Sequence, residues 1–226
     1  FYMGAKLALD ELELKGFNAK VHVFDTQNDS NIIAKLFNNP IFDNVDLVIG
    51  PLLKNEVAQV ALLCKEKRIR MICPVKLDGE VLKDNPLVYS SVTSNLTLMR
   101  GLAQHISKKS SSDNVILVKP NDKKSVAYYD EFQRVYGEIA SDNSPSLVLA
   151  SQDNFNTMMR KRDKSLFVIP TVNSKSALKF INSLNRSSFR SNPGNILVYG
   201  MKEWVNFTSV NNIYKNKYKF HFASPN

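Results

Sequence analysis

The sequence predicts an α/β protein of two lobes, each with a parallel β-sheet covered by helices on both faces. Two observations lead to this prediction. Short, continuously apolar segments alternate with segments whose apolar residues recur at helical spacing, which is typical of parallel sheets buried on both sides. The alternation is interrupted once, by an extended segment near residues 90–95, and then begins again.

The first series covers residues 1–92. A helix is expected at its start, where Phe1, Ala5 and Leu12 share one face and Gly16 is suited to end the helix. Further helices are expected at 30–37, capped by Asp29 or Ser30, and at 57–64. The expected strands are residues 21–25, 45–49, 69–73 and 87–92.

The second series covers residues 93–217. Its expected helices are 96–106, 128–139, 155–159 and 177–184, and its expected strands are 115–118, 147–149, 166–169 and 196–199. A last strand is expected at 218–223, within a segment 218–226 that crosses back toward the first lobe. Because no Gly/Ser-rich linker occurs near residues 90–95, short hinges should join the lobes.

Composition narrows the function classes. The chain has 226 residues and a net charge of +9, but its basic residues are dispersed in short clusters. This dispersion favours a solvated basic surface over a nucleic-acid site, and it leaves an anionic ligand or an anionic cell-surface polymer as alternatives. No apolar run approaches the roughly 20 residues that span a bilayer, and no signal peptide is visible, although the natural N-terminus is expected to lie before Phe1.

The cysteines and histidines show no metal-ligand spacing. Cys64 lies on the apolar face of an expected helix and Cys73 ends an expected strand, so both are interpreted as small buried hydrophobes. A disulfide between them remains an alternative without a specific signal. The three histidines lie far apart, so neither a zinc site nor any other cofactor is predicted.

Catalytic motifs are missing from the sequence. There is no G-x-S-x-G elbow, no phosphate-binding loop and no G-x-G-x-x-G fingerprint. Asp25 ends an expected strand, but a second carboxylate at a comparable place occurs only in the other lobe. We therefore expect a protein that binds a ligand and is not an enzyme.

The candidate binding residues follow the carboxyl ends of the expected strands, where open parallel sheets bind ligands. They are Lys54, Asn55, Lys76 and Asp78 in the first lobe, and Asn121, Asp122 and Asn173 in the second. Each polar residue alone is also explained as a helix cap. The residues are proposed as a binding site only because all of them should lie at the carboxyl-end edge of a sheet.

The two lysines decide what kind of ligand is expected. A lysine at a helix start opposes the helix dipole, so a compensating contact is expected for Lys54 and for Lys76. If both ammonium groups face the cleft between the lobes, they favour an acidic ligand through charge-assisted hydrogen bonds. The alternatives are that both point outward, or that Asp78 pairs with Lys76.

Five segments of the first lobe resemble the type I periplasmic solute-binding proteins, the group that includes branched-chain amino acid receptors. They are F-Y-x-G-A-x-L-A-L-D at 1–10, V-F-D-T at 23–26, V-D-L-V-I-G-P-L at 45–52, I-R-M-I-C-P at 69–74 and N-P-x-V-Y at 85–89. Residues 199–204 and 220–224 of the second lobe resemble a Bacteroidetes-type subgroup of amino acid transporter substrate-binding proteins, which often carry lysin motifs.

The resemblance implies two Rossmann-like lobes of the type I periplasmic binding protein fold, truncated at both ends, with the first strand before Phe1. It implies a solute-binding receptor of an ABC-type uptake system, periplasmic or lipid-anchored in the cell envelope. The expected ligand is an amino acid or a related acid, and the expected partners are a transporter permease or a cell-wall component. The alternative is a non-catalytic envelope interaction or structural module that kept the fold without the pocket.

The sequence departs from the family pattern at the expected site. Amino-acid-binding members usually carry Ser or Thr after the G-P-[LV] strand end and again after the proline of the next strand. Lys54 and Lys76 stand in the matching stretches here. The resemblance therefore implies that charged donors replace neutral ones in this chain.

Overall fold

The computed structural model describes residues 2–77, 81–82, 85–158, 164–187 and 195–224. The chain divides into two compact units, residues 1–92 and residues 93–226. Each unit holds its own parallel sheet and its own cluster of buried side chains. The two units are therefore described one after the other.

The first unit is built around a three-stranded sheet in the order β1-β2-β3. All neighbours are parallel, with Val48 opposite Met71 and Ile72 opposite Tyr89. Its described elements are α1 (Tyr2–Leu14), α2 (Ser30–Phe37), η1 (Pro40–Asn44), β1 (Leu47–Ile49), α3 (Lys54–Glu66), β2 (Arg70–Cys73) and β3 (Val88–Ser90).

The core of the first unit begins at α2. Ile33 and Phe37 of α2 pack with the inward face of α3 and with Met71 and Cys73 of β2. Asp29 caps α2 by accepting a hydrogen bond from the backbone N–H of Asn31. It is one of the two residues that the sequence offered as the cap. Cys64 and Cys73 are free and fully buried, which confirms their interpretation as buried hydrophobes.

The first 26 residues differ from the sequence prediction. Helix α1 forms, but none of its residues is buried, and Leu7 is 62% exposed. The strand expected at 21–25 is absent, because no described strand pairs with it and the sheet begins at β1. Val21 and Val23 are exposed, and Phe24 stacks on Phe42 at 5.4 Å between ring centroids. An apolar alternation alone does not form a strand; it also needs a neighbouring edge for its backbone hydrogen bonds.

The second unit is larger and more regular. Its described elements are α5 (Asn95–Ile106), β4 (Asn114–Val118), α6 (Lys123–Ile139), β5 (Ser146–Ala150), η2 (Phe155–Met158), β6 (Ser165–Val168), α7 (Ser174–Ser187), β7 (Ile196–Gly200), η5 (Lys202–Asn206), α8 (Asn212–Lys217) and β8 (Phe220–Phe222). The strands form one parallel sheet in the order β5-β4-β6-β7-β8.

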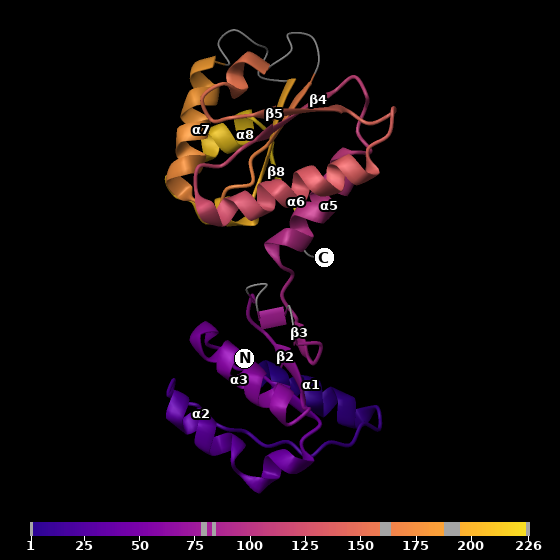
Figure 1. Cartoon of the computed structure of the whole chain (residues 1–226), viewed down its shortest axis with the longest axis vertical. Helices are drawn as coiled ribbons and strands as arrows, with labels where there is room; N and C mark the ends of the chain where they lie inside the picture. The colour runs from indigo at the N-terminus through magenta and orange to yellow at the C-terminus, as the bar shows by residue number, and fades with distance from the viewer. Residues whose placement is uncertain (1, 78–80, 83–84, 159–163, 188–194, 225–226) are drawn as a thin grey trace. The chain divides into compact units, whose positions relative to one another are not determined.

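Helices lie on both faces of this sheet, as the continuously apolar strands predicted. In Figure 1, α5 and α6 lie together on one side and α7 and α8 on the other. Every residue of β4 and of β6 is buried, because these strands are central and covered twice. Phe132 of α6 and Phe180 of α7 are among the side chains that fill the two layers.

The end of the chain belongs in part to this sheet. β8 pairs in parallel with β7, with Tyr199 opposite His221, and Tyr218 is fully buried. Residues 218–222 are therefore part of the second unit. A return crossing of the segment 218–226 toward the first unit stays a prediction.

Candidate functional site

The order of the strands defines one special place in the second unit. From β4 the chain moves to β5 on one side, and then returns past β4 to β6 on the other side. The loops after β4 and β6 therefore leave the sheet in opposite directions. Such a topological switch point, at the carboxyl ends of the strands, is where open α/β sheets bind ligands.

Asp122 and Thr171 lie at this switch point and are hydrogen-bonded to each other. The Thr171 hydroxyl donates to Oδ2 of Asp122 at 2.9 Å, which joins the loop after β4 to the loop after β6. Oδ1 of Asp122 caps α6 by accepting from the backbone N–H of Ser125 at 3.0 Å and from its hydroxyl at 2.5 Å. Both carboxylate oxygens of Asp122 therefore bind groups of the protein itself.

Asn121 and Asn173 flank this pair and are exposed. Nδ2 of Asn121 donates to Oε1 of Gln152 at 3.1 Å, which links the loops after β4 and β5. Oδ1 of Asn173 caps α7 by accepting from the N–H groups of Lys175 and Ser176. Among the described residues, Oδ1 of Asn121 and Nδ2 of Asn173 have no hydrogen-bond partner, so the site offers one acceptor and one donor to a ligand.

Sequence reasoning missed the buried side chains that hold this site together. Thr171 is fully buried, and its carbonyl accepts a 2.7 Å hydrogen bond from the indole N–H of Trp204. The Trp204 ring covers Gly200 so closely that an added Cβ would lie 2.9 Å from the ring. The signal was present, because the single tryptophan of the chain follows a strand that ends in glycine.

In the first unit, Lys54 and Asn55 begin α3 just after β1. Leu53 stands at the N-cap position and provides no side-chain hydrogen bond. Asn55 donates from Nδ2 to Oδ1 of Asn28 at 2.6 Å, so it joins the loop before α2 to the start of α3. Lys54 is exposed, and its ammonium group has no partner among the described residues.

Lys76 follows β2 and is half-buried. Because β1 and β2 are parallel, Lys76 comes after the same edge of the sheet as Lys54 and Asn55. Asp78 lies outside the described residues, so its pairing with Lys76 stays a prediction.

Glu56 is a further acidic group at this edge that the sequence did not single out. Its side chain is on the first turn of α3, the residue is only 4% exposed, and Oε1 has no hydrogen-bond partner among the described residues. A negative charge near a helix N-terminus is favoured by the dipole, but a buried oxygen without a donor costs free energy.

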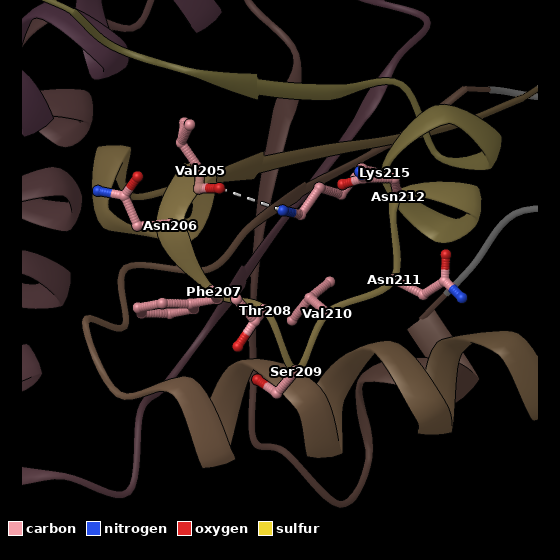
Figure 2. A pocket seen from close by; sticks show the side chains of 9 residues that line it. All are labelled: Val205, Asn206, Phe207, Thr208, Ser209, Val210, Asn211, Asn212 and Lys215. Atoms are coloured by element: carbon pink, nitrogen blue, oxygen red, sulfur yellow. Dashed lines mark hydrogen bonds between the residues drawn. The ribbon is translucent and has the colours of Figure 1, made fainter.

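A surface hollow of about 760 Å³ lies between η5 and α8 (Figure 2). Amide and hydroxyl side chains surround it, and Lys215 donates to the carbonyl of Val205 at 3.4 Å. It is lined by Val205, Asn206, Phe207, Thr208, Ser209, Val210, Asn211, Asn212 and Lys215. None of the predicted site residues lines this hollow.

The described residues show no metal-binding cluster and no activated thiol. They contain no group of three His, Cys, Asp or Glu side chains that could hold a metal ion. Burial raises the pKa of the Cys64 thiol to about 12, so this thiol is protonated at neutral pH and is no nucleophile. No described helix has the length and apolar character needed to span a membrane.

No family model matches the chain, and no curated protein matches it by sequence. Solved structures do match. A protein of Rhodospirillum rubrum described as a branched-chain amino acid ABC transporter is 12% identical, with a TM-score of 0.66 over 94% of this chain and 61% of that chain. A substrate-binding protein of Desulfitobacterium hafniense in complex with Leu is 13% identical, with a TM-score of 0.55 over 89% of this chain and 61% of that chain.

Full-length LpoA of Haemophilus influenzae also matches, at 11% identity and a TM-score of 0.59 over 91% of this chain and 37% of that chain. The chain thus spans about three fifths of the length of the transporter proteins that it resembles. These likenesses confirm the predicted fold: the chain has the parallel α/β architecture of the type I periplasmic binding proteins.

Proposed function

We propose that this chain is the ligand-binding part of a solute-binding receptor of an ABC-type uptake system, acting outside the cytoplasm. The observation that carries the proposal is the hydrogen-bonded switch point of the second unit. There Asp122 and Thr171 hold two loops together, and the exposed amides of Asn121 and Asn173 flank them. The fold, shared with substrate-binding proteins, supports the same function.

The ligand is a small polar molecule, an amino acid or a related acid. Asn121 and Asn173 supply an acceptor and a donor without loss of their structural bonds, because each amide uses its other atom within the protein. Lys54 and Lys76, after the strands of the first unit, supply cationic donors for an acidic group. Asn55 and Asp122 act mainly on the structure, since they bind Asn28, Ser125 and Thr171.

A thermal-shift screen tests this proposal. The library contains amino acids, short peptides, nucleosides and sugar acids, because these classes span charge and shape. A ligand that binds only the folded state raises the melting temperature, and at a hundred times its Kd it contributes about 2.7 kcal/mol. The double variant N121A/N173A should lose the shift, whereas T208V, in the hollow of Figure 2, should keep it.

A second candidate function is a cell-envelope interaction module without a ligand pocket. Two observations favour it. Hydrogen bonds within the protein occupy both Asp122 oxygens and Oδ1 of Asn173, and LpoA shares the fold. If this second function is correct, no member of the library should raise the melting temperature. The second function also predicts retention of the chain on isolated cell wall or on a transporter-free envelope fraction, unaffected by N121A/N173A.

The proposed function includes a partner and a location in the cell. A transporter permease or a cell-wall component is the expected partner, and the location is periplasmic or lipid-anchored. Membership of the Bacteroidetes-type subgroup and attached lysin motifs stay predictions. Co-purification of a permease with a tagged full-length protein tests the transporter partner.

A further inference from the structure

The connection between the two units is short and is held at both ends. The division between the units falls between Val92 and Thr93. On the side of the first unit, Ser90 and Val92 form a local turn, in which the Ser90 hydroxyl donates to the Val92 carbonyl at 2.9 Å. The N–H of Val92 in turn donates to the same hydroxyl at 3.2 Å.

On the side of the second unit, the chain enters α5 at Asn95. Ser94 caps this helix by accepting from the backbone N–H of Thr97 at 3.1 Å. Asn95 is the first helical residue and is only 4% exposed, although it stands three residues after Val92. A polar side chain so close to a connection is ordinarily solvated, so its burial needs an explanation.

Glu203 provides that explanation. Nδ2 of Asn95 donates to Oε1 of Glu203 at 2.9 Å, between residues that are 108 positions apart in the sequence. Glu203 lies in η5, just after β7. The bond therefore fastens the start of α5 to the carboxyl end of a strand that is paired on both sides. A hydrogen bond to a carboxylate is roughly twice as strong as one between neutral groups.

We propose that the bond between Asn95 and Glu203 fixes the point at which the connection leaves the second unit. Asn95 and Glu203 are thus positioning residues for the hinge. With the bond in place, backbone rotation between the units is confined to the few residues around Thr93. Without it, the first turn of α5 can fray and lengthen the flexible stretch, because helix ends lose their bonds easily. This inference holds whether or not the chain binds a ligand.

Single-molecule energy transfer in the full chain, without ligand, tests the proposal. Dyes are attached at Ala34→Cys on α2 and Ala127→Cys on α6, which are both exposed. The native cysteines are fully buried and are therefore protected from labelling. N95A and E203A break the bond from either side, and E203Q keeps an acceptor for Asn95.

The matched control is N114A, since Asn114 is also buried and its Nδ2 also donates a 2.9 Å hydrogen bond, to the carbonyl of Met158. We expect N95A and E203A to broaden the distribution of transfer efficiencies, with E203Q and N114A like the parent. Thermal melting checks that each variant is folded. If either N95A or E203A fails to fold, the other variant still tests the proposal. Unchanged widths in N95A and E203A, or equal broadening in N114A, would overturn the proposal.

Discussion

Thr171 donates its hydroxyl hydrogen to Asp122 across two strands that are neighbours in the sheet but come from segments 49 residues apart. This bond connects the loops of the switch point, and it does so from a threonine that is fully buried. Replacement by valine keeps the shape and removes the hydroxyl, which donates to Asp122 and also accepts a 3.2 Å hydrogen bond from the backbone N–H of Asn173. The candidate site and the stability of the second unit therefore depend on the same side chain.

T171V should lower the free energy of unfolding by about 1–3 kcal/mol, because it leaves Oδ2 of Asp122 without its donor and the N–H of Asn173 without its acceptor. Urea unfolding followed by circular dichroism measures the change. T208V is the matched control, since Thr208 is exposed and is expected to change stability by less than about 0.5 kcal/mol. Equal effects of the two variants would show that the bond contributes nothing.

A second prediction concerns Gly200. An added Cβ would lie 2.9 Å from the Trp204 ring, which is buried and cannot move away freely. G200A should therefore lower the free energy of unfolding by about 1–3 kcal/mol through overpacking. Gly101, in α5, has open space around it, so G101A should raise stability by up to about 1 kcal/mol. The two substitutions should change the free energy of unfolding in opposite directions. A G200A variant as stable as the parent would contradict the packing argument.

The sequence predicted the second unit well because its strands are apolar on both faces and its helices show a clear period. Val115 to Val118 and Leu166 to Val168 are buried as expected. The segment 21–24 shows the same apolar character and yet forms no strand, since pairing depends on a neighbour that periodicity does not reveal.

The candidate site was predicted less well. Asn121, Asp122 and Asn173 lie in the loops at the carboxyl ends of the strands, as expected, and their role in binding stays a prediction. Their buried partners Gln152 and Thr171 were not, because a hydrogen bond between distant loops depends on the order of strands in the sheet. Helix capping, the alternative considered for each candidate residue, does occur at Oδ1 of Asp122, whereas the bond of Oδ2 to Thr171 was not predicted.

Glu131 should make stability depend on pH. It bonds Arg100 of α5 and Arg134 of α6, the latter at 3.0 Å, and the hydrogen bonds from Arg134 and then Arg100 lower the pKa of its carboxyl. A lowered folded pKa means that the stabilisation is present above the unfolded value of about 4.5 and is lost as pH falls through the folded pKa. E131Q should therefore be less stable at pH 7, by at most about 1 kcal/mol for a partly exposed network.

Urea titrations of E131Q and the parent at pH 7 and pH 3 measure this dependence. The difference between them should shrink at pH 3. A difference that is the same at both values would place its origin in packing, and a larger difference at pH 3 would contradict the sign.

Glu56 should be a site where an apolar replacement is tolerated or stabilising. Its Oε1 is buried without a partner among the described residues, and methionine has a similar shape. E56M should raise the free energy of unfolding by about 1–3 kcal/mol, the cost of an unsatisfied buried group. E66M, at the exposed end of the same helix, should change it by less than about 0.5 kcal/mol. A marked loss of stability in E56M would mean that the carboxylate has a structural partner.

The last prediction concerns the two lysines at the strand ends of the first unit. If Lys54 and Lys76 bind an acidic group of the ligand, then K54A and K76A should each weaken binding by about 1.5–3 kcal/mol, the range for hydrogen bonds to charged groups. L-Glutamate and L-leucine serve as paired probes in isothermal titration, because they differ in side-chain charge. The loss should be larger for L-glutamate and should shrink in high salt, since Lys54 is exposed and its field is screened. K35A, at the exposed last turn of α2, is the control and should leave both affinities unchanged. Equal affinities of K54A, K76A and the parent for L-glutamate would mean that both ammonium groups point away from the ligand, and the acidic-ligand hypothesis would fail.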